Sequence, residues 1–160
     1  MTKLHAGGDS ANIIPGQAEF SLDLRAQTNE IMDALVEKVR TAINSVADFY
    51  KVKILLDIPE HLAAARVHPE AQAIMEEAIT RILGKDHLDE PIMTTGGEDF
   101  HFYSLKRPEL KTTMLGLGCD LKPGLHHPHM TFNHEAILPG SKILATALLL
   151  ALDKAKAQQK

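Results

Sequence analysis

The sequence has little of what marks several large classes of protein. Cys119 is its only cysteine, so no disulfide can form within the chain, and a reducing compartment is expected. The net charge of -4, without any basic cluster, argues against a nucleic-acid surface. The first residues lack the apolar core of a signal peptide, and the longest apolar run, Ile143 to Leu152, is too short to span a bilayer. These absences predict a cytoplasmic protein that contacts neither nucleic acid nor a membrane.

What remains is the composition of a folded protein, with 44% hydrophobic and 24% charged residues. At 160 residues the chain is long enough for one ordinary domain or two small ones. A nucleotide-binding loop is missing, because Gly116-Leu117-Gly118 lacks both the third glycine and the Lys-Ser/Thr pair.

The first part of the chain predicts a strand followed by a helix. Apolar and polar residues alternate from Ala18 to Arg25, which is typical of a half-buried strand. Pro15-Gly16 before it fits the central pair of a type II turn. Apolar residues then recur every three or four positions from Ile31 to Tyr50, and either Thr28 or Asn29 can cap that helix.

A second strand is predicted from Val52 to Ile58 by the same alternation. Strand, helix and strand with short joints make an α/β unit, so both strands should pair in one sheet that the helix covers. The character of the chain changes after Pro59, and we place a domain boundary between Glu60 and Val67.

The second part predicts a helix that begins at Pro69 and ends at Gly84. Short strands are expected at Ile92–Thr95 and Thr112–Leu117. A last helix should begin at Pro139-Gly140-Ser141 and run from Lys142 to about Ala155. Because it is apolar almost all round, we expect it to be buried on more than one side.

A loop rich in histidine precedes that last helix. His126, His127, His129 and His134 fall within nine residues, and neutral imidazole is the commonest nitrogen ligand of zinc. Pro128 favours an extended conformation at His127, which would put His127 and His129 on one face and His126 on the other. At most one of them is then a ligand. An exposed polar loop with incidental histidines explains the run equally simply.

A second candidate is the loop Gly96-Gly97-Glu98-Asp99-Phe100. Its glycines allow the backbone to approach a ligand closely, although a plain turn before a helix fits the same residues. Glu98 and Asp99 are paired acids beside an apolar side chain, but acids are also common at the start of a helix. Cys119 has no basic or thiol neighbour in sequence, so we interpret it as a buried or incidental thiol.

Taken together, the order Asn-Ile-Ile-Pro, an alternating strand ending in Arg25, Gly-Gly-Glu-Asp-Phe and Leu-His-His-Pro resembles one enzyme family. It is similar to the dinuclear zinc amidohydrolases, the aminoacylase-type metallopeptidases that include aminoacylase, hippurate hydrolase and the auxin-conjugate hydrolases. The resemblance covers about Gly7 to Ala151. It implies an α/β (α+β) fold: residues 1–62 would be the second half of a ferredoxin-like lid or dimerisation domain, and residues 63–160 the C-terminal part of a zinc-peptidase-like catalytic domain.

The resemblance also implies roles for particular residues. His126 matches the family's last metal ligand, Asn12 and Arg25 match lid residues that bind the substrate's carbonyl and carboxylate, and Gly96-Gly97 match a loop that faces the substrate. Arg25 could equally be a solvated charge at a strand end. The other metal ligands and the general base would lie before Met1, and His127 and His129 match no ligand position.

The implied activity is metal-dependent hydrolysis of the amide bond of an N-acyl amino acid or a small peptide-like substrate. Two divalent ions, zinc or else manganese or cobalt, would serve the intact enzyme, and a homodimer would form through the lid domain. With only one of the metal ligands in the sequence, we expect the chain alone to be inactive. The alternative is a non-catalytic dimerisation or binding module.

Overall fold

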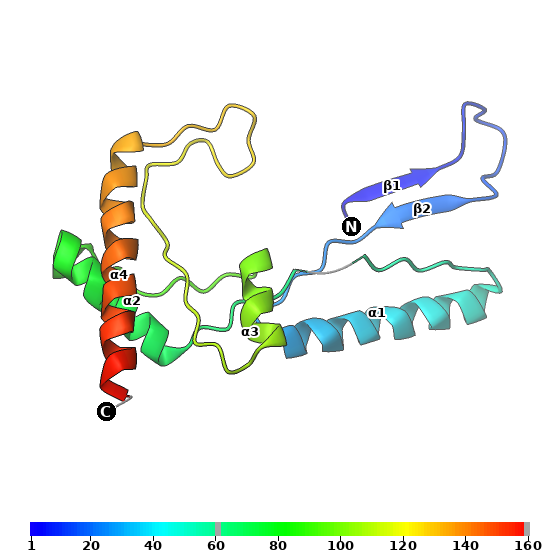
Figure 1. Cartoon of the computed structure of the whole chain (residues 1–160). Helices are drawn as coiled ribbons and strands as arrows, with labels where there is room; N and C mark the ends of the chain where they lie inside the picture. The colour runs from blue at the N-terminus through cyan, green and yellow to red at the C-terminus, as the bar shows by residue number, and fades with distance from the viewer. Residues whose placement is uncertain (60–61, 159–160) are drawn as a thin grey trace. The chain divides into compact units, whose positions relative to one another are not determined.

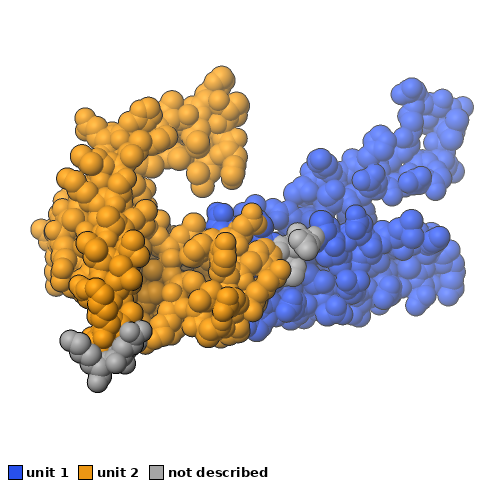
Figure 2. Space-filling model, in the orientation of Figure 1, with its two compact units in different colours: residues 1–64, 94–98 blue, residues 65–93, 99–160 orange. Residues whose placement is uncertain are grey.

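The computed structural model describes residues 1–59 and 62–158 (Figure 1). The chain forms two compact units, coloured separately in Figure 2. Unit 1 contains residues 1–64 and 94–98, and unit 2 contains residues 65–93 and 99–160. The units part between Ala64 and Ala65, and the short segment Thr94–Glu98 returns to unit 1. The expected boundary region begins at Glu60, which lies outside the described residues together with His61. The assignment of residues 1–62 and 63–160 to two family domains stays a prediction.

Unit 1 contains a β-hairpin of which only one strand was expected. β1 (Lys3–Ala6) pairs antiparallel with β2 (Ala18–Ser21), with Lys3 opposite Ser21 and Ala6 opposite Ala18. The prediction that β2 continues to Arg25 was wrong. The strand ends early because of the register: Lys3, the first residue of β1, lies opposite Ser21, so the residues beyond Ser21 soon have no strand beside them.

The loop between the two strands does not contain the expected type II turn. Such a turn needs a positive φ at Gly16, and the glycines with positive φ are Gly7, at 83°, and Gly84. A Cβ at Gly7 would lie 3.3 Å from Pro15 Cγ, so the loop closes by bringing Pro15 against Gly7 rather than by turning at Gly16. This loop carries Asn12.

The helix expected after β2 is confirmed. α1 (Asn29–Tyr50) begins after Thr28, whose hydroxyl accepts a hydrogen bond from the Ile31 amide at 3.2 Å. It ends at Lys51, which has the left-handed φ of 55°. At 1.5 Å per residue the helix is about 33 Å long.

The strand predicted for Val52–Ile58 is not formed. Alternation records only that a segment has one apolar side, whereas a strand also needs a hydrogen-bonded neighbour. Ala64 is bonded to Asn29 at the start of α1, so the chain after Lys51 has to return the length of the helix. In the described part of the chain, this returning segment pairs with no strand (Figure 1). The regular sheet is therefore the two-stranded hairpin alone.

Unit 2 is organised around two helices, the first of which was predicted to within one residue. α2 (Pro69–Leu83) has His68 as N-cap and Gly84 as C-cap. It packs on α4 (Ile137–Gln158). Ala78 of α2 and Ile143 and Ala147 of α4 are the buried centre of this contact. The half-buried side chains packed around them are Ile74, Met75, Ile79, Ile82, Leu115 and Leu150.

α4 differs from its prediction in two ways. It begins at Ile137, so Pro139 and Gly140 lie within its first turn, where a proline costs no hydrogen bond. A Cβ at Gly140 would lie 2.6 Å from Leu117 Cδ2, so the glycine admits that leucine. The expected burial on more than one side is wrong for unit 2: Ile143 is 1% exposed, while Leu144, Leu148, Leu149 and Leu152 are exposed.

The helical stretch His134–Ala157 is, by length and composition, apolar enough to cross a membrane. The uninterrupted apolar run Ile143 to Leu152 is shorter than this helix, so the prediction that the run is too short to span a bilayer does not hold for the whole helix. A core helix of a soluble protein can have the same length and composition, so this property alone does not identify a membrane protein. The absence of membrane contact stays a prediction.

The remaining elements of unit 2 are short. Residues Lys85–His87, Asp99–His101 and His134–Ala136 form 3₁₀ turns, and α3 spans Phe102–Lys106. The strands predicted at Ile92–Thr95 and Thr112–Leu117 are not formed; Thr112 makes one backbone contact, accepting from the His68 amide at 2.9 Å. Lys111 Nζ lies 2.7 Å from Glu70 Oε2 and lowers the pKa of that carboxyl by hydrogen bonding. Helices with one small sheet are compatible with the α/β class.

Candidate functional site

The histidine loop is a closed hairpin, not the extended segment that Pro128 favoured. Lys122 and Thr131 exchange backbone hydrogen bonds of 2.9 and 2.8 Å. Outside that pair, the Asn133 amide donates to the Cys119 carbonyl at 2.7 Å. The chain turns inside this frame because His126 adopts a left-handed φ of 63°. Two tight turns between Gly124 and Met130 therefore replace the extended backbone.

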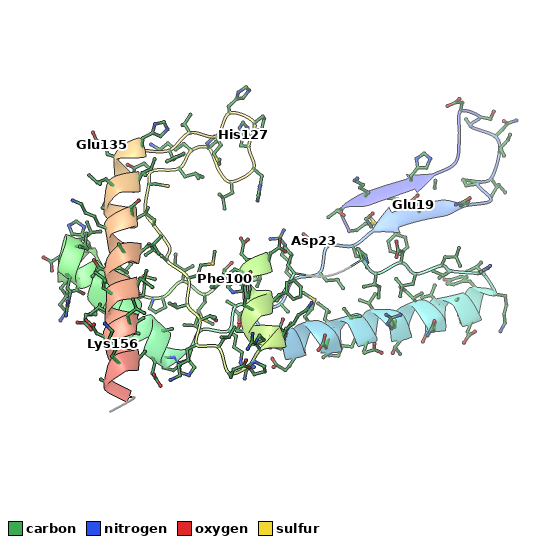
Figure 3. All side chains as sticks on the ribbon, viewed as in Figure 1. Glu19, Asp23, Phe100, His127, Glu135 and Lys156 are labelled. Carbon is green, nitrogen blue, oxygen red and sulfur yellow. The ribbon has the colours of Figure 1, made fainter. Side chains whose placement is uncertain are left out.

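The three histidines of the loop differ in what their rings do. His127 Nδ1 accepts the His129 backbone amide at 3.1 Å, and the two rings lie 5.7 Å apart, so these side chains share one side as expected. In a neutral imidazole that accepts at Nδ1, the proton is on Nε2, so neither nitrogen offers a free lone pair. The His126 ring is exposed and has no hydrogen bond within the described chain. Figure 3 shows His127 on this loop and Glu135 in the 3₁₀ turn just before α4.

The loop with Gly96 and Gly97 approaches the protein's own backbone. A Cβ at Gly97 would lie 2.5 Å from Leu62 Cβ and 3.0 Å from the Ala63 carbonyl oxygen, so only glycine fits. The Glu98 amide donates to that same Ala63 oxygen at 3.3 Å. The Gly96 amide donates to Thr94 Oγ1 at 3.0 Å. Both glycines are half-buried, and the loop is held against residues 62–63 of unit 1.

Sequence reasoning missed the contact that fixes residues 63–64. Asn29 Oδ1 accepts from the Ala64 amide at 2.9 Å, and Asn29 Nδ2 donates to the Ala64 carbonyl at 3.5 Å. The sequence offered Thr28 and Asn29 as alternative helix caps; because Thr28 does the capping, the Asn29 amide is free for Ala64. The available signal in the sequence was Asn29 directly after Thr28, because a helix start needs only one of these two capping residues.

The two expected substrate ligands of unit 1 are both exposed. Asn12 lies in a turn of the β1–β2 loop. Arg25 follows β2, and its Nε lies 3.0 Å from Asp23 Oδ2 (Asp23 is labelled in Figure 3). Within the described chain the two terminal nitrogens of Arg25 have no other partner, and they form the edge of the guanidinium that can bind a carboxylate in a bidentate pair.

The site residues expected from the sequence are thus divided between the units. Asn12, Arg25, Gly96 and Gly97 belong to unit 1, and His126 belongs to unit 2. Among residues 1–59 and 62–158, no three His, Cys, Asp or Glu side chains gather closely enough to hold a metal ion. The described residues therefore fit one ligand of a metal centre and do not fit a complete one. Glu98 and Asp99 are exposed, and Asp99 begins a 3₁₀ turn.

Comparison with known proteins gives consistent matches over almost all of the chain. The model of peptidase family M20/M25/M40 matches residues 5–150. N-acetyldiaminopimelate deacetylase of Leuconostoc citreum (strain KM20) is 27% identical over 148 residues, which are 89% of this chain and 36% of that protein. N-acetylcysteine deacetylase of Bacillus subtilis (strain 168) is 26% identical over 157 residues, which are 98% of this chain and 40% of that protein.

A third relative has a name of another class. A protein of Rhodococcus jostii (strain RHA1) named "Putative glutamate--cysteine ligase 2-3" is 30% identical over 141 residues, which are 87% of this chain but 18% of that protein. The chain thus spans well under half the length of each of these relatives. No solved structure matches the chain. The match to the family model covers far more than half of the sequence, so the chain belongs to peptidase family M20/M25/M40.

Proposed function

We propose that the intact protein is a metal-dependent hydrolase that cleaves the amide bond of an N-acyl amino acid or a related small peptide-like substrate. The observation that carries this proposal is the family match over residues 5–150, together with two relatives whose names say that they remove acetyl groups from amino acids. Because the chain spans only 36% and 40% of these deacetylases, the activity is proposed for the intact protein.

In this proposal unit 1 binds the polar ends of the substrate. The terminal nitrogens of Arg25 would hold the free carboxylate, since a guanidinium presents two parallel donors to two carboxylate oxygens. Asp23 supports this role because it occupies Nε and leaves the two terminal nitrogens available to a ligand. The exposed Asn12 amide would donate to the substrate carbonyl. Gly96 and Gly97 would line the substrate with backbone instead of side chain.

His126 is proposed as a metal ligand of the intact protein. Its ring is exposed and unbonded in the described chain, whereas the Nδ1 of its neighbour His127 is occupied. One imidazole cannot hold a catalytic ion, which takes about three protein ligands. The described residues contain no cluster of three His, Cys, Asp or Glu side chains, so we derive no chemical step through a metal from this chain.

A second function is favoured for the chain by itself. The lack of a three-ligand cluster in the described part of the chain, and the leucines exposed along α4, fit a non-catalytic binding or dimerisation module. Both proposals lead to one experiment. The 160-residue chain and the complete gene product would each be incubated with zinc, manganese or cobalt and a panel of N-acyl amino acids.

We expect hydrolysis by the complete gene product and none by the chain alone. In the complete product, Arg25→Ala should raise KM for substrates with a free carboxylate and leave their amidated analogues unaffected. Arg40→Ala is a matched control, because Arg40 is another exposed arginine of the same unit whose Nε also lies beside a carboxylate, that of Glu37. Efficient hydrolysis by the chain alone, or an Arg25→Ala variant with an unchanged KM, would contradict the proposal.

A further inference from the structure

Three successive contacts connect the start of α1 to the Gly96-Gly97 loop, all of them within unit 1. The first is the pair of hydrogen bonds between the Asn29 side chain and the backbone of Ala64. The second is the bond from the Glu98 amide to the Ala63 carbonyl. The third is the close approach of Gly97 to Leu62 and Ala63. Each contact shares a residue or a peptide neighbour with the next, so the loop sits where the 62–64 segment places it.

The Asn29 side chain is well suited to fix a single peptide. Its amide group carries one acceptor and one donor group, and it satisfies both the N–H and the C=O of Ala64, as a neighbouring strand would. Ala63 is fully buried and Ala64 nearly so, at 0% and 8% exposed. A buried backbone group without a partner is costly, and water cannot easily reach this peptide to replace the lost bonds. Loss of the Asn29 bonds should therefore shift the segment 62–64.

The helix start explains why Asn29 is available for this contact. An asparagine in this position commonly caps a helix, and in that role its side chain would be turned toward its own backbone. Here the Thr28 hydroxyl takes the Ile31 amide instead. Asn29 is therefore the first residue of a rigid helix of 22 residues, with its side chain directed to another segment.

We propose that Asn29 is a positioning residue, which holds the Gly96-Gly97 loop in place by clamping Ala64. The proposal rests on the proposed function for the role of the loop, because there the two glycines line the substrate. The clamp itself does not depend on that role. A side chain at the start of α1 thereby determines where the backbone N–H groups of the loop are presented.

The test is amide hydrogen exchange, followed by NMR on the chain and its variants. Asn29→Leu keeps the size of the side chain and removes both hydrogen bonds. Because a hydrogen bond of this kind contributes about a factor of ten to an equilibrium, we expect exchange about tenfold faster at Ala64 and also at Glu98. The amides of α2, which belong to unit 2, serve as the internal reference and should not change.

Two further variants separate the clamp from general loosening of the helix. Thr28→Ala removes the cap and leaves Asn29 in place; it should speed exchange at Ile31 and leave Ala64 and Glu98 unchanged. Asn29→Asp keeps the acceptor for the Ala64 amide at the positive end of the helix, so it should restore most of the protection. Faster exchange at Ala64 without any change at Glu98, or equal effects of Thr28→Ala and Asn29→Leu, would overturn the proposal.

A titration with N-acetylglycine distinguishes this failure from failure of the proposed function. If the loop lines the substrate, the Gly96 and Gly97 signals should shift in the natural sequence and shift less in Asn29→Leu. If those signals do not move in the natural sequence while exchange at Ala64 and Glu98 stays coupled, the clamp is supported and the substrate role of the loop is removed.

Discussion

At the scale of single residues, the hydrogen bonds of the ring nitrogens separate His127 from the other two histidines of the loop. His126 stands at the left-handed position of the turn with both nitrogens unbonded in the described chain. The Nδ1 of His127 accepts a hydrogen bond from the His129 backbone amide. His127 would have to break that bond or change its tautomer before it could bind a metal ion. The closed hairpin therefore disfavours His127. The ring nitrogens of His126 and His129 are both unbonded in the described chain, so between these two only the family resemblance favours His126.

We therefore expect His126→Ala to lower the metal content of the complete gene product by one ion per chain and to abolish most of its hydrolysis. His129→Ala should leave the metal content unchanged, because the family resemblance places the ligand at His126 and matches no ligand position to His129. Metal analysis of both variants, with rates on the same substrates, measures the difference. Equal loss in the two variants would mean that the ligand has been assigned wrongly.

At the scale of elements, α4 has one buried and one exposed apolar face, and the two should differ sharply in what they contribute to stability. Ile143 is 1% exposed and packs in the α2–α4 contact, whereas Leu148 on the same helix is 61% exposed. Truncating a buried isoleucine leaves a cavity and costs about 2–5 kcal/mol. Substitution of an exposed residue changes stability by about 0.5 kcal/mol or less.

We expect Ile143→Ala to lower the free energy of unfolding by about 2–5 kcal/mol, and Leu148→Ala to change it by no more than about 0.5 kcal/mol. Denaturant unfolding followed by circular dichroism would measure both. A large effect of Leu148→Ala at low protein concentration would show that its face is covered in solution.

The elements also show what could be predicted from the sequence. α1 and α2 were predicted closely because a helix is closed by bonds between near neighbours, so Thr28, Pro69 and Gly84 mark its ends locally. The strand expected at 52–58 failed because alternation cannot say whether a partner lies alongside. The Asn29–Ala64 contact joins residues 35 apart in sequence and leaves no periodic trace.

The candidate site was predictable to the same degree. Composition and spacing identified the histidine loop and the two glycines, and only the resemblance singled out Asn12, Arg25 and His126. The sequence could not show which group approaches each glycine or how the histidine loop bends. Gly97 is approached by the chain's own residues 62–63. The loop turns at His126 instead of running extended.

At the scale of the whole molecule, the chain exposes more surface than its mass requires. Its accessible surface is 13160 Å². Two separate compact bodies of half the mass each would expose about 9,500 Å². The excess includes apolar side chains in both units, among them Phe20 and Leu22 in or beside the hairpin and Leu148 on α4. Surface of this kind associates.

We accordingly expect the chain to be a dimer or larger at micromolar concentration, with the hairpin of the proposed lid unit at the contact. Light scattering measures the mass. Phe20→Lys should weaken association, because a lysine on an exposed strand opposes edge pairing. Leu148→Lys is the matched control on unit 2. A monomeric chain, or a stronger effect of Leu148→Lys, would contradict association through the hairpin.

The return of Thr94–Glu98 to unit 1 has a consequence for gene recombination. The chain leaves unit 1 after Ala64, comes back for five residues and leaves again after Glu98, so no single crossover in the gene can exchange one unit whole. A recombinant that took residues 65–160 from a relative would bring a foreign loop against the resident Leu62 and Ala63, where only a glycine fits at position 97. Such hybrids should fold only when the incoming segment 94–98 fits the resident segment 62–64, so recombination should preserve these two segments as a pair.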